Sequence, residues 1–265
     1  MQKRLLLGVA VVLVLGLGLA AGLYFSSPSS EPSSPGGSLE TAQAQLDAGD
    51  FQAARATLEQ IVASDAENAE AHFLLGLAHF NLQEYTKAEE LFNRSMELDP
   101  DRAAAVYHNL GVLAYQLGNM DQAMQEFQTA LEIDPSDPDT HYQLGATYLV
   151  MAFPMGAVEP DAEFLAQSEA EFEQALDLSA DKSEALVGLA NVYMFQNKIS
   201  DAIGLLEKAV EKNPDMREAL FALGRAYAVS GQMDRARETL QHFLETKPPE
   251  VWAQQAQELL DQLGP

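Results

Sequence analysis

Residues 223–236 read LGRAYAVSGQMDRA, and the same order of small and large residues returns along the chain. The stretch opens on a leucine followed by Gly224, has an aromatic residue at Tyr227, and reaches a second small residue at Ala236, twelve positions after the glycine. The same opening is found at Leu144, Gly145 and Tyr148. Self-similarity of this kind predicts a fold built from repeated units.

Two series of small residues define the period. The first small position is occupied by Ala42, Gly76, Gly111, Gly145, Ala190 and Gly224, at intervals of 34, 35, 34, 45 and 34. The second is occupied by Ala54, Ala88, Ala123, Ser168, Ala202 and Ala236, at intervals of 34, 35, 45, 34 and 34. The two series differ only in the place of the 45-residue interval, which is 11 residues longer than the usual interval of 34. An 11-residue insertion therefore lies between Gly145 and Ser168.

Each unit has the pattern of two amphipathic helices. Apolar residues recur at helical spacing on both sides of the small position, as at Phe73, Leu77 and Phe80. A small residue is expected where two antiparallel helices approach closely, since added methylenes there cost ~1–3 kcal/mol. A proline ends four of the units, because it cannot continue a helix. These prolines are Pro100, Pro135, Pro214 and Pro248.

This pattern resembles the tetratricopeptide repeat family, in which L-G-x-x-Y is followed by A-x-x-x-F and then by proline, with a period of about 34 residues. The second half of the motif is matched by Ala88 with Phe92 and by Ala123 with Phe127. The resemblance implies an all-α, right-handed superhelical solenoid of six helix hairpins over residues 39–248, with the insertion in the fourth. An apolar stretch at 249–265 is then the C-terminal capping helix that a stack of repeats requires.

The N-terminus predicts a membrane anchor within residues 1–25. Residues 5–25 contain no charge, and 21 helical residues are long enough to span a ~30 Å hydrocarbon core. Lys3 and Arg4 precede this segment, so the positive-inside rule places the N-terminus in the cytoplasm and the repeats outside it. The alternative is a cleaved signal peptide with small residues at Gly18 and Ala20 and release into the periplasm. A Ser/Pro/Gly linker follows at 26–38.

Composition excludes several functions. The 265 residues include 40 Asp and Glu but 15 Lys and Arg, a formal charge of −25, which opposes nucleic-acid binding. There is no cysteine, hence no disulfide or thiolate site. The five histidines are scattered, and the sequence has no phosphate-binding loop or nucleophile elbow. We therefore expect no catalytic, cofactor or metal site, and no enzymatic activity.

The family resemblance implies a groove for a peptide or a helix of a protein partner on the first helix of each hairpin. The positions that face such a groove are mostly apolar and aromatic in this chain, so we expect apolar pockets rather than capture of a C-terminal carboxylate. The candidate groove residues are Phe73, Leu77, Phe80, His108, Val112, Tyr115, Tyr142, Leu149, Asn191, Met194, Phe221 and Arg225. The alternative is that some of these side chains belong to the core of their own repeat.

Two further features are open to two interpretations. The acidic residues Glu70, Asp139, Glu184 and Glu218 form either a rim that steers a basic partner or a solvated face. The insertion within 151–165 is either a lid or an extension whose apolar residues pack on the neighbouring repeat.

Two functions fit these expectations. The first is a membrane-anchored scaffold or adaptor at the bacterial inner membrane, in envelope assembly such as cytochrome c maturation, secretion or pilus biogenesis. The second is a structural protein that self-assembles into homo-oligomers through its repeats.

Overall fold

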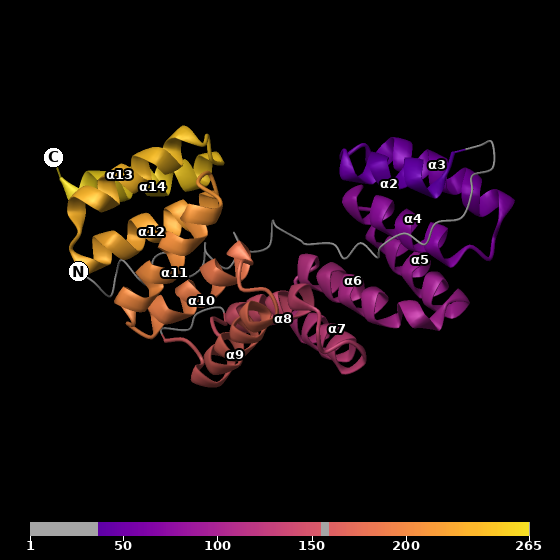
Figure 1. The fold of residues 1–265 in the computed structure, drawn as a ribbon, viewed down its shortest axis with the longest axis horizontal. Helices are drawn as coiled ribbons and strands as arrows, with labels where there is room; N and C mark the ends of the chain where they lie inside the picture. Colours follow the sequence, from indigo (N-terminus) through magenta and orange to yellow (C-terminus); the bar gives the residue numbers. More distant parts are fainter. Residues whose placement is uncertain (1–36, 155–158, 265) are drawn as a thin grey trace. The chain divides into compact units, whose positions relative to one another are not determined.

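The computed structural model describes residues 37–154 and 159–264, in which all regular structure is helical (Figure 1). Thirteen α-helices and one short 3-10 helix, η2, occur in these residues, with no strand. The all-α class expected from the sequence is confirmed for these residues. In chain order the elements are α2 Leu39–Asp47, α3 Phe51–Ser64, α4 Ala69–Asn81, α5 Tyr85–Leu98, η2 Pro100–Arg102, α6 Ala103–Gln116, α7 Met120–Ile133, α8 Pro138–Met151, α9 Ala162–Leu178, α10 Ser183–Phe195, α11 Ile199–Lys212, α12 Arg217–Ser230, α13 Met233–Glu245 and α14 Glu250–Leu263.

Consecutive helices pack as hairpins, each with a first and a second helix. The pairs are α2 with α3, α4 with α5, α6 with α7, α8 with α9, α10 with α11, and α12 with α13. Helix α14 packs on α13 and α12, as expected of a terminal cap. Two compact units divide the chain, one ending at Ser136 and containing α2–α7, the other beginning at Asp137 and containing α8–α14.

Side-chain caps mark where several helices begin. The Ser38 hydroxyl accepts a hydrogen bond from the Thr41 amide at 3.1 Å, at the start of α2. The Asn68 side chain accepts from the Ala71 amide at 2.9 Å and begins α4. Asp161 likewise accepts from the Glu163 amide at 2.9 Å at the start of α9. Each cap satisfies an amide that has no partner inside its own helix, and this fixes the first turn.

The small residues lie where the two helices of a hairpin touch, as the sequence predicts. A Cβ atom added at Gly76 would lie 2.7 Å from the ring of Phe92, and one added at Gly111 would lie 2.6 Å from the ring of Phe127. Helix α9 presents Phe172 in the same way, and this ring lies against both Gly145 and Gly188. The first and second helices can therefore approach this closely only because the first helix carries no side chain at these points.

The insertion in the fourth hairpin packs on its surroundings. The ring of Phe153, after α8, lies 4.4 Å from the ring of Phe195 at the end of α10. Phe164, in α9, stacks on Tyr148 of α8 at 6.1 Å between ring centroids. The Asp161 amide donates to the Ala152 carbonyl at 2.8 Å and closes the base of the connection. These contacts support packing on the neighbouring repeat, the second of the two interpretations of this segment.

The predicted anchor at residues 5–25, the cleavage site after Ala20 and most of the 26–38 linker lie outside the described residues. Within 37–154 and 159–264, no helix has the length and apolar character needed to cross a membrane. The handedness of the predicted superhelix stays a prediction.

Candidate functional site

The twelve predicted groove residues all lie on the first helices of the hairpins. Helix α4 carries three, α6 three, α8 two, α10 two and α12 two. All twelve are buried: Tyr115 is the most exposed, at 9%, and Phe73 and Leu77 are completely shielded. Helix α4 shows how far this goes, because every residue from Ala71 to Phe80 is buried. The accessible apolar lining that we expected is therefore not what these side chains form in the described residues.

Four of the twelve have a packing role inside their own repeat. Each occupies the same repeat position and places its ring against an aromatic ring of the second helix. The ring pairs are Phe73 with Phe92 at 5.6 Å, His108 with Phe127 at 5.8 Å, Tyr142 with Phe172 at 6.0 Å, and Phe221 with Phe243 at 5.2 Å. The structure thus favours the alternative interpretation, a core role, at this position. Contact with a partner through any of the twelve stays a prediction.

Three of the predicted residues are polar groups buried without satisfied hydrogen bonds. Burial raises the pKa of the Tyr115 hydroxyl to about 12, and this hydroxyl has no hydrogen-bond partner in the described residues. Both amide atoms of Asn191 are likewise unpartnered there. Desolvation lowers the pKa of Arg225 to about 10, which leaves its guanidinium charged at neutral pH. Such groups are uncommon in a folded core, because the free energy lost on desolvating each polar atom is not offset by a hydrogen bond.

Two more buried polar residues, which are not among the twelve groove candidates, join this set. Asn109, in α6, donates its amide to the Ala105 carbonyl at 2.8 Å but leaves its side-chain oxygen unpartnered in the described structure. The Gln143 amide nitrogen, in α8, also lacks a partner there. The sequence did carry a signal for these two buried polar groups, because Asn109 and Gln143 are amide residues within mostly apolar helices. Helical periodicity gave no reason to separate them from the core.

Two of the four predicted rim acids are held in ion pairs. The Arg102 guanidinium lies 3.4 Å from the Glu70 carboxylate and 3.1 Å from that of Asp99. Lys182 pairs with Asp139 in the same way, in the repeat that carries the insertion. The residues at the corresponding places after Glu184 and Glu218 are Met216 and Glu250, which carry no positive charge. Within the described residues, only the last two acids of the rim therefore lack such a pair.

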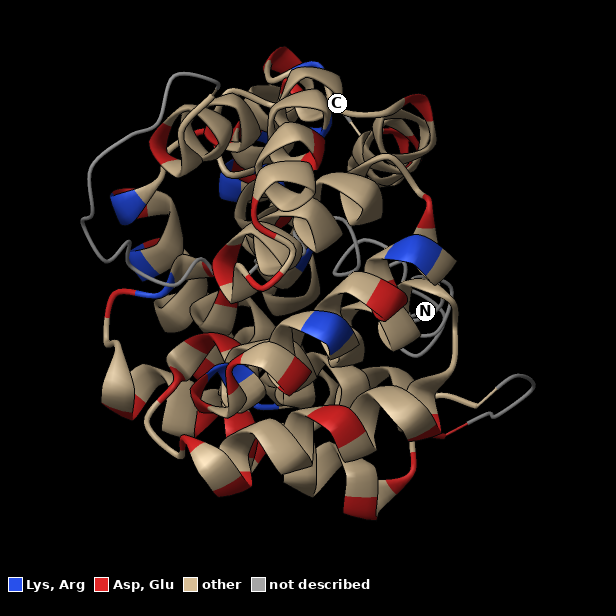
Figure 2. Cartoon of the chain, turned by 90° about the vertical axis from the view of Figure 1, so that its right-hand side faces the viewer, with Lys and Arg blue, Asp and Glu red and all other residues tan. Residues whose placement is uncertain are grey.

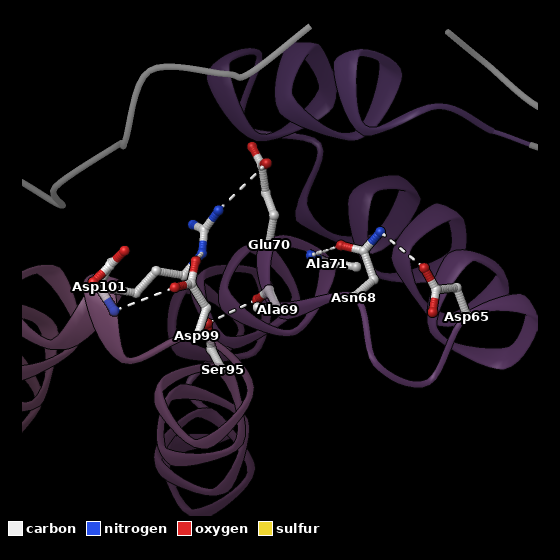
Figure 3. A network of polar contacts seen from close by, with 9 residues as sticks. Asp65, Asn68, Ala69, Glu70, Ala71, Ser95, Asp99 and Asp101 are labelled. Atoms are coloured by element: carbon white, nitrogen blue, oxygen red, sulfur yellow. Dashed lines mark hydrogen bonds and ion pairs between the residues drawn. The ribbon is translucent and has the colours of Figure 1, made fainter. Parts of the chain in front are cut away.

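The junction between α5 and α6 shows how neighbouring hairpins are joined (Figure 3). The buried Ser95 hydroxyl, in α5, donates to the Ala69 carbonyl at the start of α4, at 2.7 Å. Asp99 accepts from the Asp101 amide at 3.2 Å and so begins η2. Since Arg102 joins Asp99 to Glu70, this network is structural, and Asp99 and Asp101 are turn residues.

Acidic residues outnumber basic ones in the sequence and are spread over many helices (Figure 2). No group of three or more potential metal ligands occurs in the part of the chain that the structure describes. Three histidines instead pair with single carboxylates. The pairs are His79 with Glu84 at 2.6 Å, His141 with Glu171 at 2.7 Å, and His242 with Asp215 at 3.2 Å.

Family models place the chain among known proteins. A tetratricopeptide repeat model matches residues 39–103 and 187–250, and a second TPR repeat model matches residues 111–151. Together these matches span more than half of the sequence, and the chain belongs to the tetratricopeptide repeat family.

Among curated proteins, the chain is 28% identical over 124 residues to a Protein CTR9 homolog of Arabidopsis thaliana, which covers 46% of this chain and 11% of that protein. It spans about a tenth to a fifth of the length of the curated relatives that it matches. The similarity is therefore confined to a small part of each of these relatives.

Solved structures show the same fold at low identity. Pseudomonas aeruginosa pilF superposes with a TM-score of 0.68 at 19% identity, covering 83% of this chain and 94% of pilF. PilW, described as a widely conserved type IV pilus biogenesis factor, gives a TM-score of 0.66 at 20% identity, covering 82% and 94%. YrrB, described as a TPR protein with an unusual peptide-binding site, gives 0.54 at 18% identity, covering 76% and 97%.

Proposed function

We propose that this protein is a non-enzymatic scaffold that binds a segment of a protein partner on the first helices of its hairpins. The observation that carries the proposal is the set of buried, unsatisfied polar groups on these helices. Tyr115, Asn109, Asn191 and Arg225 each bury at least one polar side-chain atom that has no hydrogen-bond partner in the described residues. A bound polypeptide supplies both the apolar contacts and the missing donors and acceptors.

We further propose that the scaffold is anchored in the inner membrane of a bacterium by residues 5–25, with its repeats outside the cytoplasm. The uncharged segment and the two preceding cations support this orientation. The likeness in fold to pilF and PilW, the second described as a pilus biogenesis factor, supports a role in assembly of the cell envelope. Self-assembly into homo-oligomers is the competing function, and light scattering on the purified protein separates the two.

A photoreactive amino acid at position 115 tests partner binding in living cells. Tyr115 is the most exposed of the candidate residues, and its hydroxyl lacks a partner in the described structure, so a bound segment is expected to lie against it. The matched control carries the same photoreactive group at Leu178, an exposed position of α9. A discrete adduct from position 115 and none from position 178 supports binding on the first helices. Equal labelling from both positions contradicts it.

The anchor is tested separately by membrane fractionation. The full chain should stay in the membrane pellet after an alkaline wash, because a 21-residue apolar helix remains inserted. A Leu13→Arg variant should be released, since a cation near the middle of the span opposes insertion. If mass spectrometry shows that the mature protein begins after Ala20, the segment is instead a cleaved signal peptide.

A further inference from the structure

A pocket of about 540 Å³ is lined by residues of α10, α12 and α13 and of the turn before α12. Its lining includes four carboxylates, those of Glu184, Asp215, Glu218 and Glu245. Two potential cations also line it, and both are engaged by other groups. The Arg217 guanidinium donates to the Thr246 carbonyl at 3.0 Å, and the His242 ring lies 3.2 Å from Asp215. The pocket therefore carries an excess of negative charge.

Two other hairpins show what an acid at this repeat position binds. Like Glu184, Glu70 and Asp139 are each the second residue of a first helix. The Arg102 guanidinium, immediately before α6, lies 3.4 Å from Glu70. Lys182, immediately before α10, pairs with Asp139 in the same way. In both cases the acid therefore holds a cation that the chain supplies from the start of the next first helix.

At the pocket the chain supplies no such cation. Met216 stands immediately before α12, at the place that corresponds to Arg102 and Lys182, and it lines the pocket together with Glu184 and Glu218. A thioether carries no charge, so Glu184 has no ion pair within the described residues. The same is true of Glu218 in this part of the chain. The position of the acid is thus kept, while the position of its cation is open.

We propose that Glu184 and Glu218 form a subsite for one lysine or arginine side chain of the protein partner. This inference rests on the function proposed above and names a residue type that the bound segment must contain. Both acids belong to first helices, on which that segment is proposed to bind. The charged end of the side chain pairs with the carboxylates, and its methylene stem lies against Met216.

These two acids differ from other acids at helix starts. An acid in the first turn of a helix is common, because the free amides there favour negative charge. Glu163, in the first turn of α9, is such an acid, and it is exposed. Glu184 and Glu218 are half-buried and line a pocket whose volume suits a side chain. An organic cation fits them better than a metal ion, since the described residues contain no group of three or more potential metal ligands.

The first test supplies the cation from within the chain. Met216→Arg places a guanidinium where the other repeats have Arg102 and Lys182, so the melting temperature at low salt should rise by about 1–3 °C. The rise should disappear when Glu184→Gln is combined with it. Met216→Gln, which changes the same side chain without adding charge, is the control and should give no rise. If Met216→Arg gives no rise, or the same rise with Glu184→Gln, the acid does not hold a cation and the subsite is refuted.

The second test measures recognition with a synthetic library of twelve-residue apolar peptides, each with one lysine, one arginine or neither. The full chain should select peptides that contain a cation, and replacing that residue by glutamine should weaken binding about 3- to 10-fold at low salt. Glu184→Gln should weaken binding of the cationic peptide by a similar factor and should not weaken the glutamine peptide further. Met216→Arg should have the same effect, because its own guanidinium then occupies the acids. Glu163→Gln, which changes the net charge equally at an exposed position, is the control and should bind as the unmodified chain does.

The outcomes separate this inference from the function on which it rests. Peptides that bind with no preference for a cation refute the subsite and leave the scaffold function standing. A preference that Glu163→Gln reduces as much as Glu184→Gln does comes from the net charge of the chain, and it also refutes the subsite. Failure of every peptide to bind the unmodified chain counts against both.

Discussion

The first and second helices of one hairpin differ in how much of their surface is buried. Helix α10 buries nine of its 13 residues, whereas α11 buries four of 14, namely Ala202, Ile203, Leu206 and Ala209. The second helix is therefore an ordinary amphipathic surface helix with one apolar stripe. The first helix is surrounded on nearly all sides, and its sequence alone does not tell which of its faces would meet a partner.

The largest effect is expected where the second helix inserts a ring between two first helices. Phe172 is fully buried and lies against both Gly145 and Gly188. Phe172→Ala should lower the free energy of unfolding by about 3–5 kcal/mol, because it leaves a cavity between three helices. Leu178→Ala, at the exposed end of the same helix, should change it by less than about 0.5 kcal/mol. Urea denaturation measures both, and similar losses would show that the ring is not the anchor.

The same substitution should have opposite signs on the two helices of one hairpin. A Cβ at Gly188, in α10, would lie 2.5 Å from the Phe172 ring, so Gly188→Ala should destabilise the protein by about 1–3 kcal/mol. A Cβ at Gly204, in α11, meets nothing within 4 Å. Gly204→Ala should therefore stabilise by about 0.5–1 kcal/mol through helix propensity. Chemical denaturation of the two variants compares them directly, and equal signs would contradict the difference in packing.

The turn between the two helices offers a smaller effect. Gln83 has a φ of 61°, in the left-handed region, where other hairpins have Gly49, Gly118 and Gly231. Gln83→Gly should stabilise the protein by about 0.5–1 kcal/mol. The substitution removes the backbone strain of the folded state, and this gain is partly offset because glycine raises the conformational entropy of the unfolded chain. In the reverse experiment, Gly118→Ala should cost about 1 kcal/mol. A Gln83→Gly variant that is less stable than the original chain would mean that the side chain matters more than the strain.

The smallest expected effect is a change in acid stability at the start of α5. The Glu84 carboxylate accepts hydrogen bonds from His79 at 2.6 Å and from Lys87 at 3.2 Å. Both bonds lower the pKa of Glu84, and the bond from His79 has the larger effect. A lowered folded-state pKa gives stability that is present above the unfolded pKa and is lost as pH falls through the folded value. Glu84→Gln should therefore show a flatter decline in stability between about pH 5 and 3.

Urea titrations at several pH values measure this decline, with Glu89→Gln, an exposed carboxyl of the same helix, as the control. A decline in Glu84→Gln as steep as that of the control would contradict the assignment.

The sequence predicted the repeat positions well because each has a local cause. Gly76 and Gly111 mark the close approach of two helices, and Phe92 and Phe127, on the second helices of the same hairpins, are the rings that fill it. The candidate site was predicted less well. Phe73 has the same apolar character whether it faces a partner or Phe92, and only the contact with Phe92 shows that it serves the core. The left-handed backbone of Gln83 could be inferred only from its register with Gly49, Gly118 and Gly231, because glutamine itself does not favour that conformation.

The sequence by itself determined the period, the pairing of helices into hairpins and the place of the insertion. These follow from residue size and helical spacing, which act over short distances along the chain. Only the tertiary structure decided which buried groups are satisfied. Arg102 and Arg225 are the same residue type, yet within the described residues one meets two carboxylates and the other none. That difference depends on which side chains neighbouring repeats bring together, because electrostatic compensation is a property of the packed structure.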